Sequence, residues 1–422
     1  MRQSKLLVRT KKEIDEKIEA VSHKFLVKGD FIEEAGAGIY SFLPLGFLVL
    51  KKIADIIREE MQEIGAQEIL LPALHQKELW QKSGRWEKMD PPLFKLKDRH
   101  QKEFALASTH EEIITQLFQR RIYSFRDLPV AFFQIQTKFR NEMRATGGLL
   151  RQREFWMKDL YSFHAAEEDA VSFYERVKKS YYKIFRRCGI DSIAVEAMSG
   201  TIGGALSHEF MVESEAGENK ILVCTKCTFG ANVEKIGEIK NCPRCKGKIS
   251  EKSTIELGHV FYLGEKYSKT FNLKFSTDKG NKEYVKMGCF GIGIPRLMAS
   301  VIEKNHDEKG IIWPREIAPF LIHLIPLWSK DAEDKSKVKR VSDSLYLALQ
   351  KSGVGVLLED RENKSVGEKF ADSDLIGIPF RLVVSEKTLK KSSVEIKKRG
   401  EERGKLVKID SILKNPQKII IR

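Results

Sequence analysis

Four cysteines in a short stretch place the tightest constraint on how this chain can fold. In CTKCTFGANVEKIGEIKNCPRC, one CxxC pair is Cys224/Cys227 and the other is Cys242/Cys245. This spacing is typical of a four-thiolate zinc site, which would bring both turns onto one metal ion and define a ribbon-like insert over about 221–250. The alternative is a pair of free CxxC turns left from a lost site.

The charge balance of the chain favours a polyanionic partner. Its 422 residues include 74 Lys and Arg against 59 Asp and Glu, which gives a formal net charge of +15. Such an excess suits contact with phosphates, and in combination with a zinc ribbon it also suits DNA binding. A basic surface that is simply solvated is the alternative.

Composition also bears on the compartment. No apolar run approaches the ~20 residues that a membrane span needs, and the start MRQSKLLVRTKKE has no apolar region of a secretory signal. Six cysteines, four of them clustered, indicate a reducing compartment with a metal site rather than a disulfide scaffold. We therefore expect a cytoplasmic protein without a membrane partner.

Hydrophobic periodicity predicts the main elements of the first three quarters. Apolar positions over 47–65 recur at helical spacing, and Gly65 is a natural stop. The next segment, AQEILLPAL, predicts a buried strand that ends at Pro72. Further strands are predicted over 104–107, 131–139 and 153–163, and a further helix over 166–187.

The sequence pattern changes after Pro319. FLIHLIPL and GVGVLLED predict short strands, a helix is predicted over 333–351, and another helix leads into IPFRLVV. This alternation of strands and helices indicates a domain of its own. The segment 321–422 holds 22 Lys and Arg against 15 Asp and Glu, so this domain is a good candidate for contact with the polyanion.

Two segments combine glycines and arginines in ways that suit phosphate binding. FRNEMRATGGLLRQREFWMKDLYSF predicts two strands around a glycine-containing loop, and its four arginines carry planar forks that match phosphate oxygens. MGCFGIGIPRLMASVIE predicts a glycine-rich strand that runs into a helix with Arg296 near its start. A basic surface hairpin and a glycine-packed corner are the respective alternatives, and neither segment is a P-loop.

Taken together, these segments resemble a known family. GIYSFLPLGFLVLKKIADIIREEMQEIGAQEILLPAL resembles motif 1 of the class II aminoacyl-tRNA synthetases, and the two arginine-bearing segments resemble motifs 2 and 3, in the expected order. SGRW, STHEE, REFWMKDLYSFH, SHEF, GHVFYLGEKYS and FADSDLIGIP are similar to bacterial-type prolyl-tRNA synthetases. The resemblance covers essentially the whole chain and is far more specific than the two CxxC pairs.

The resemblance implies a fold, an activity and partners. It implies a mixed α/β (α+β) chain: a catalytic domain over 1–318, built on an antiparallel sheet flanked by helices, and an α/β anticodon-binding domain over 319–422. It implies that ATP and L-proline form prolyl-adenylate and that tRNA(Pro) receives the prolyl group, with Mg²⁺ to neutralise the polyphosphate. It further implies a homodimer, for which the helix over 47–64 is the expected interface, and no DNA partner.

The same resemblance assigns residues to the ATP site. Arg140 is expected to hold the α-phosphate together with the proline carboxylate, and Arg296 the γ-phosphate. Both are the expected catalytic residues, because adenylate formation needs charge neutralisation and alignment more than a general base. The full ATP set is Arg140, Glu142 and Phe155 at the adenine end, Arg151, Glu256 as a weak candidate Mg²⁺ ligand, His259, Gly291, Gly293 and Arg296.

The proline pocket and the anticodon site are assigned in the same way. Met157, Asp159 and Tyr161 alternate along one predicted strand and therefore share a face. Core packing is the alternative for Met157, Tyr161 and Phe261. The proline set is Thr109, Glu111, Arg140, Met157, Asp159, Tyr161, His259 and Phe261, and the anticodon set is Glu359, Asp360, Arg361 and Lys369.

The sequence departs from the family pattern in three places. The motif 2 loop reads RATGGLL where relatives carry RPRFGL or similar, and ASTHEE replaces GPTHEE. The segment between motifs 2 and 3 already contains SHEF, the cysteines and GHVF, which leaves no room for the domain that hydrolyses alanyl-tRNA in many bacterial members. We therefore expect no editing in cis, and the zinc cluster is expected to be a structural staple at that position.

Three other functions would each account for part of the sequence. A threonine-specific synthetase shares the C-terminal domain but uses Cys and His zinc ligands inside its catalytic site, whereas the paired cysteines here lie outside the three motifs. A paralogue without catalysis would have lost the motif arginines or the Thr109/Glu111 pair, which are present. A DNA-binding zinc ribbon explains the cysteines but none of the motifs.

Overall fold

The computed structural model describes residues 1–237, 239–328 and 331–417. They divide into two compact units. One comprises Met1–Glu33, Ser41–Lys52 and Val301–Arg422, and the other Glu34–Tyr40 and Ile53–Ser300. None of the helices in the described residues is both long enough and apolar enough to cross a membrane.

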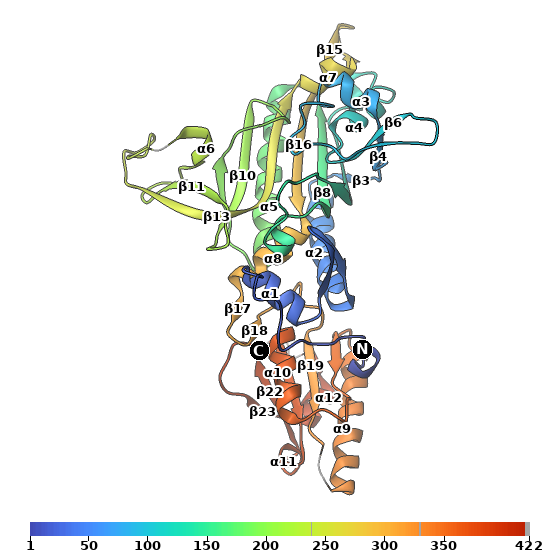
Figure 1. Cartoon of the computed structure of the whole chain (residues 1–422), viewed down its shortest axis with the longest axis vertical. Helices are drawn as coiled ribbons and strands as arrows, with labels where there is room; N and C mark the ends of the chain where they lie inside the picture. Colours follow the sequence, from blue (N-terminus) through green and yellow to red (C-terminus); the bar gives the residue numbers. More distant parts are fainter. Residues whose placement is uncertain (238, 329–330, 418–422) are drawn as a thin grey trace. The chain divides into compact units, whose positions relative to one another are not determined.

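A nine-stranded sheet forms the centre of the unit that contains Ile53–Ser300 (Figure 1), and most pairs of adjacent strands in it are antiparallel. Helix α5 (Glu167–Arg187) packs against three of its central strands. This arrangement confirms the predicted mixed α/β fold class. In order across the sheet, the strands are β10 (Leu206–Glu213), β9 (Ile193–Glu196), β12 (Gly230–Asn232), β11 (Asn219–Cys224), β13 (Ile249–Gly264), β16 (Lys286–Gly293), β8 (Glu154–His164), β7 (Val130–Phe139) and β3 (Gln67–Glu68).

Shorter elements surround this sheet. A three-stranded sheet has the order β4-β6-β5, and β14 pairs with β15. Their bounds are β4 (Leu74–Gln76), β5 (Lys95–Lys97), β6 (Glu103–Leu106), β14 (Lys274–Ser276) and β15 (Lys282–Tyr284), with helices α2 (Pro44–Glu63), α3 (Lys77–Lys82), α4 (Glu111–Phe118), α6 (Val233–Ile236), α7 (Lys266–Phe271) and α8 (Ile294–Lys304) and the 3₁₀ turns η2 (Phe125–Asp127) and η3 (Gly148–Leu150).

One predicted strand is wrong for most of its length. The prediction extended the strand to Pro72, but β3 covers only Gln67–Glu68. Side chains of β7 replace the ladder beyond it: Gln134 Oε1 accepts from the Leu71 amide at 3.0 Å, and Gln136 donates to the Leu71 carbonyl. Because these side chains satisfy the backbone of Leu71, the segment leaves the strand ladder. The predicted burial is also wrong for most of the run, since Leu71 is 5% exposed but Leu70 is 75% exposed.

Strand alternation decides which side chains of β8 face the site. Lys158 points toward α5, where its Nζ lies 2.5 Å from the Tyr181 hydroxyl. Its neighbours Met157 and Asp159 point to the opposite face and line the cavity described below. The predicted glycine-rich strand and helix are confirmed as β16 and α8, which follow each other without a break.

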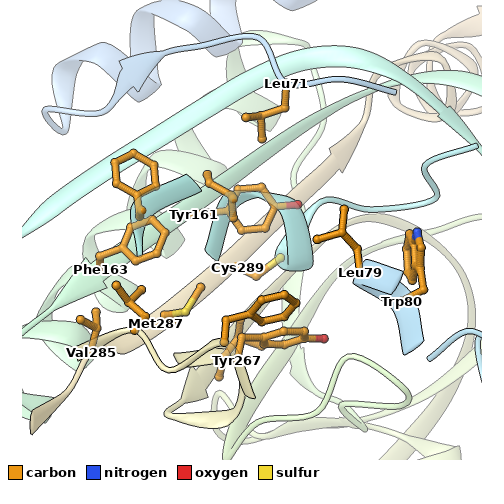
Figure 2. Close-up of a cluster of buried hydrophobic side chains, with 14 of the residues drawn as sticks. Leu71, Leu79, Trp80, Tyr161, Phe163, Tyr267, Val285, Met287 and Cys289 are labelled. Atoms are coloured by element: carbon orange, nitrogen blue, oxygen red, sulfur yellow. The ribbon is translucent and has the colours of Figure 1, made fainter. Parts of the chain in front are cut away.

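A cluster of buried apolar side chains lies on this same face of the sheet, beside the cavity, and Phe261 and Cys289 belong to both (Figure 2). Tyr161 of β8 and Cys289 of β16 face each other across the two paired strands. Trp80 and Tyr267 of the flanking helices pack in the same cluster, and each of these four side chains is at most 5% exposed. The polar residues of the site are therefore bordered by buried apolar side chains.

The other unit contains a five-stranded sheet in the order β20-β19-β21-β22-β23. β19 is parallel to both of its neighbours, and the predicted helix over 333–351 is confirmed as α9 (Ala332–Lys351). The strands are β19 (Ile322–Pro326), β20 (Val356–Leu358), β21 (Phe380–Val384), β22 (Ser393–Lys398) and β23 (Lys405–Lys408), and the other helices are α10 (Val366–Ile376), α11 (Glu386–Leu389) and α12 (Ile409–Lys414). Elements outside the two large sheets are η1 (Gln3–Lys5), α1 (Val21–Lys28), β1 (Ile32–Gly36), β2 (Ile39–Phe42), β17 (His306–Asp307) and β18 (Gly310–Ile311).

Candidate active site

A cavity of about 250 Å³ opens on the face of β8, β13 and β16 that points away from α5. It brings together most of the residues assigned to ATP and proline from distant parts of the chain. The predicted residues that line it are Thr109, Arg140, Glu142, Phe155, Met157, Asp159, Glu256, His259, Phe261, Gly291, Gly293 and Arg296.

Arg140 follows the end of β7 and brings a positive charge into this cavity that forms no ion pair within the described residues. Its guanidinium lies 5.3 Å from the centre of the Phe155 ring, and its buried Nε has no hydrogen-bond partner among the described residues. Burial lowers the pKa of Arg140, and the nearby charge of Arg296 lowers it further. A guanidinium that borders a cavity and has a buried nitrogen without a partner suits an anionic ligand.

Arg296 reaches the same cavity from the first turn of α8. Its Nε donates to the Leu150 carbonyl at 2.9 Å, and its Nη1 forms an ion pair with Glu256 Oε2 at 3.1 Å. These contacts hold the side chain in place beside the Arg140 charge. Two arginines of the two glycine-containing segments thus converge, as the resemblance implied.

Arg151 behaves differently from its assignment to ATP. Its Nε donates to Glu142 Oε2 and its Nη1 to Glu218 Oε2, both at 3.0 Å, and the side chain does not line the cavity. Glu142 does line the cavity and is 8% exposed. In this structure Arg151 therefore orients Glu142, and a contact of Arg151 with ATP stays a prediction.

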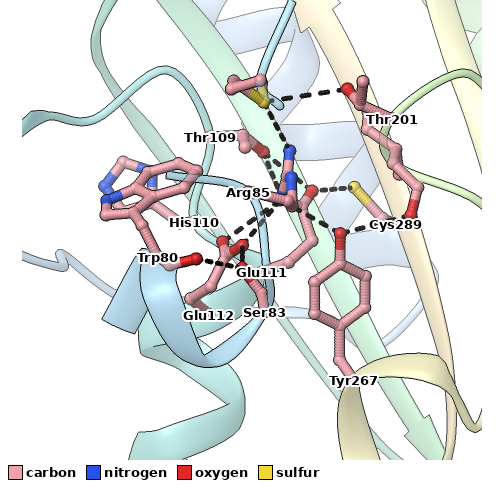
Figure 3. A network of polar contacts seen from close by, with 12 residues as sticks. Trp80, Ser83, Arg85, Thr109, His110, Glu111, Glu112, Thr201, Tyr267 and Cys289 are labelled. Carbon is pink, nitrogen blue, oxygen red and sulfur yellow. Dashed lines mark hydrogen bonds and ion pairs between the residues drawn. The ribbon is translucent and has the colours of Figure 1, made fainter. Parts of the chain in front are cut away.

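Glu111 lies directly behind Thr109 and does not line the cavity (Figure 3). The Thr109 hydroxyl lies 2.7 Å from each Glu111 carboxylate oxygen, and Glu111 is fully buried. Its carboxylate also accepts from Arg85 Nη1 and from the Cys289 thiol, both at 3.0 Å. Thr109 thus lines the pocket, and Glu111 fixes the orientation of the Thr109 hydroxyl from outside the pocket.

Arg85 is the centre of the polar network in Figure 3, and sequence reasoning did not assign it to the site. The guanidinium is 3% exposed and donates to Glu112 Oε1 at 2.9 Å and to the Tyr267 hydroxyl at 3.0 Å, besides Glu111. Burial works against its charged form, but the carboxylates of Glu112 and Glu111 raise its pKa. The available signal is that Arg85 lies in SGRW, one of the segments that carry the family resemblance.

A second buried network holds the loop of Thr109 in place. Asp159 Oδ1 lies 2.8 Å from Lys138 Nζ, and Asp159 Oδ2 accepts from the Tyr161 hydroxyl at 2.9 Å. The same hydroxyl accepts from the His110 amide at 3.0 Å. Burial raises the pKa of Asp159, but the charges of Lys138 and His110 and the hydrogen bonds from Lys138 and Gln134 together outweigh this effect and lower it. Tyr161 is 1% exposed and does not line the cavity, so it acts as a support of the pocket.

His259 stacks on Phe261 at 3.8 Å and is held by the Ser207 hydroxyl, 2.6 Å from its Nε2. Burial lowers the pKa of His259 to about 4, so the ring is neutral at pH 7. On its other side, Nδ1 lies 3.6 Å from Glu209 and 3.8 Å from Glu256. Burial and the charge of Glu256 raise the pKa of Glu209 to about 7.

Sequence reasoning missed part of the cavity wall. Cys289 lies on it, outside the cysteine cluster, and β16 places it directly opposite Tyr161. The loop 198–202 carries no residue type that marks a site, so only the folded chain reveals it. The unassigned wall residues are Met89–Pro91, Leu149, Leu150, Gln152, Met198–Ile202, Leu257, Gly258 and Cys289.

The four clustered cysteines converge at the tip of β11 and β13. Their sulfur atoms all lie within 4.8 Å of one another, with 3.5 Å between Cys224 and Cys245 and 3.6 Å between Cys227 and Cys242. They do not line the cavity. The donor set and its compactness fit a four-thiolate metal ion with no open position.

The residues assigned to the anticodon lie together in the other unit. Arg361 forms an ion pair with Glu359 and a second with Asp372 at 2.8 Å. Glu359 is fully buried and Lys369 is 1% exposed, with its Nζ donating to the Pro326 carbonyl. The structure thus groups these residues, and their roles toward anticodon bases stay predictions.

Family comparisons match both parts of the chain. Residues 94–305 match the tRNA synthetase class II core domain (G, H, P, S and T), and residues 322–418 match the Anticodon binding domain. Among curated proteins, Proline–tRNA ligase of Halothermothrix orenii is 33% identical over 570 residues, covering 100% of this chain and 99% of the relative. Proline–tRNA ligase of Sulfurimonas denitrificans is 40% identical over 407 residues, covering 92% of each.

A solved structure shows the same fold. The prolyl-tRNA synthetase of Giardia lamblia, in complex with prolyl-adenylate, superposes with a TM-score of 0.79 at 22% sequence identity. The match covers 92% of this chain and 75% of that chain. At this identity the likeness concerns the fold alone.

Proposed function

Since the chain belongs to the proline–tRNA ligase family of class II aminoacyl-tRNA synthetases, we propose that it activates L-proline with ATP and transfers the prolyl group to the 3′ end of tRNA(Pro). The observation that carries the proposal is the convergence of Arg140 and Arg296 beside Thr109 in one cavity. A guanidinium with a buried, unsatisfied Nε next to a second arginine suits the polyphosphate of ATP.

The chemistry follows from this placement. A carboxylate oxygen of proline attacks the α-phosphorus, and the bond to the bridging oxygen of pyrophosphate breaks. Arg140 is placed to draw the two negative groups together and to stabilise the charge that develops on phosphorus, because a preorganised cation costs no reorganisation during reaction. A ribose hydroxyl of tRNA then attacks the prolyl carbonyl, and AMP leaves.

The residues beside His259 fit a magnesium ion. Glu209 and Glu256 both approach its Nδ1, so two carboxylates lie close together near Arg296. Carboxylate oxygens are the ligands Mg²⁺ prefers, and the ion would neutralise phosphate charge. Glu209 comes from the SHEF segment and was not assigned in the sequence, whereas Glu256 was.

Amino-acid-dependent exchange of pyrophosphate into ATP tests the proposed function. We expect proline to support the fastest exchange and alanine to support slower exchange, because each methylene missing from the substrate costs roughly 10–200-fold in kcat/KM. Exchange that is faster with threonine than with proline would favour the threonine-specific alternative. No exchange with any amino acid would favour a paralogue without catalysis.

The same enzyme is expected to leave alanyl-tRNA(Pro) intact. The described residues between β8 and β16 belong to the same compact unit as the rest of the sheet. The alignment with the Halothermothrix relative runs over 570 positions, so that relative carries residues which this chain lacks. Deacylation of alanyl-tRNA(Pro) well above the rate in buffer would contradict the absence of editing.

We further propose that the cysteine cluster binds zinc as a structural staple. Cys242 is fully buried beside Phe229 and Ala231, and the four thiolates close the end of a long hairpin. Four protein ligands leave no position for substrate, so the ion supplies folding energy to the insert rather than chemistry.

Replacing Cys242 with serine is expected to abolish zinc binding and to lower the melting temperature while proline-dependent exchange persists. Elemental analysis, thermal unfolding and the exchange assay measure the three quantities. Cys188→Ser, at a buried cysteine outside the cluster, is the matched control and should retain zinc. Loss of exchange in a folded, metal-free Cys242→Ser variant would instead place the metal in catalysis.

The partners follow from the family. The match to the anticodon-binding domain supports tRNA(Pro) as the polyanion that the net charge of +15 suits. We also propose a homodimer with α2 in its interface, since class II enzymes dimerise through motif 1.

A further inference from the structure

The N-terminal residues pair with the edge of the sheet that bears the expected anticodon residues. β20 is an edge strand, and Arg2 forms a parallel bridge with Leu358, whose amide donates to the Met1 carbonyl at 2.9 Å. The segment thus supplies the partner that an exposed edge otherwise lacks. It also ends beside the three residues that follow β20, Glu359–Arg361.

Two side chains of this segment hold those residues. The amide of Ser4 and its hydroxyl donate to the two oxygens of Asp360, at 2.8 and 2.7 Å. Gln3 is 2% exposed, and its amide lies between Glu359 and Arg361. With its nitrogen directed to Glu359 Oε2, at 3.1 Å, its oxygen accepts from Arg361 Nη2 at 2.9 Å.

The neighbouring surface combines an aromatic ring with charges of both signs. A hollow of about 100 Å³ is lined by Arg2, Trp328, Lys339, Asp360 and Glu362, among others. Arg2 has a 40% exposed side chain, 2.6 Å from Asp343 and 3.7 Å from Asp360. Aromatic rings stack on bases, carboxylates accept from base amino groups, and arginine binds phosphate, so the composition suits a single-stranded nucleotide.

We propose that the segment Arg2–Ser4 is part of the surface that reads the tRNA anticodon. Gln3 and Ser4 are positioning residues that fix Glu359, Asp360 and Arg361, and Arg2 contacts the anticodon loop itself. The proposal rests on the proposed function, because it takes tRNA(Pro) as the partner. Because Glu359 is buried, it would act on the tRNA through Arg361, with which it forms an ion pair and shares the Gln3 amide.

The test compares two reactions of the same enzyme. Proline-dependent pyrophosphate exchange needs no tRNA, whereas charging of a tRNA(Pro) transcript does. The Gln3→Leu/Ser4→Ala double variant is expected to raise KM for the transcript by about tenfold, the loss typical of hydrogen bonds to charged groups, with exchange unchanged. Ser4→Ala alone tests the same point with a smaller change, should the double variant unfold.

A second measurement distinguishes a role in anticodon recognition from a purely structural role. Transcripts with one substituted anticodon base should be charged more slowly by the unaltered protein, and the double variant should lose most of this discrimination. Leu7→Ala, at a 72% exposed position three residues after this segment, is the control and should change neither reaction. Unchanged charging, or slower charging with full discrimination, would overturn the inference. Failure of the unaltered protein to exchange pyrophosphate would overturn the proposed function instead.

Discussion

Arg140→Ala is expected to lower proline-dependent pyrophosphate exchange by on the order of 10²- to 10³-fold, the loss that follows removal of one preorganised charge donor. The unusual part of the prediction is stability. Burial and Arg296 both oppose the charge of Arg140, and its Nε is unsatisfied within the described residues. Although three nearby carboxylates favour its charge, desolvation has the larger effect, so removing Arg140 should leave the melting temperature unchanged or raise it.

Exchange kinetics and thermal unfolding of the same preparation check both halves of this prediction. Arg144→Ala is the matched control, since Arg144 is exposed on the loop that follows Arg140 and does not line the cavity. It should retain exchange. If Arg140→Ala lost activity and melting temperature together, the residue would be a structural one, and the charge argument would be wrong.

Local rules predicted the parts of this site that depend on one element. The alternation along β8 was readable because a strand has period two, and the structure places Met157 and Asp159 on the cavity face. The join of β16 to α8 was readable from glycine-rich residues followed by helical spacing. The strand predicted for AQEILLPAL was wrong beyond Glu68. Side chains of another strand, Gln134 and Gln136, form the hydrogen bonds to the backbone of Leu71 that a neighbouring strand would otherwise form.

Contacts between residues far apart in the chain could not be predicted from these local patterns. Only the resemblance to motifs 2 and 3 implied that Arg140 and Arg296 meet, since they lie far apart in the chain. The network of Arg85 joins α3, α4 and α7, and no spacing within one segment signals it. The contact of Gln3 with Glu359 spans nearly the whole chain for the same reason.

Arg85→Met is expected to cost roughly 3–5 kcal/mol in the free energy of unfolding, because it strands two fully buried carboxylates without a counter-charge. The loss should depend on pH. Burial already raises the pKa of Glu112, and removing the guanidinium raises it further. A carboxyl with a raised folded pKa stabilises the fold while it is protonated and loses that contribution as pH rises. The difference in the free energy of unfolding between Arg85→Met and the unaltered protein should therefore be smaller at pH 5 than at pH 8.

Denaturant unfolding at the two pH values measures that difference. Adding Glu112→Gln to Arg85→Met should recover part of the loss at pH 8, because one of the stranded charges is then gone. Lys88→Ala, an exposed cation three residues away, should change little at either pH. In the folded fraction, Arg85→Met should also raise KM for proline, since Glu111 would no longer be held behind Thr109. A pH-independent loss would mean that packing against Trp80 and Tyr267, rather than charge, is what Arg85 contributes.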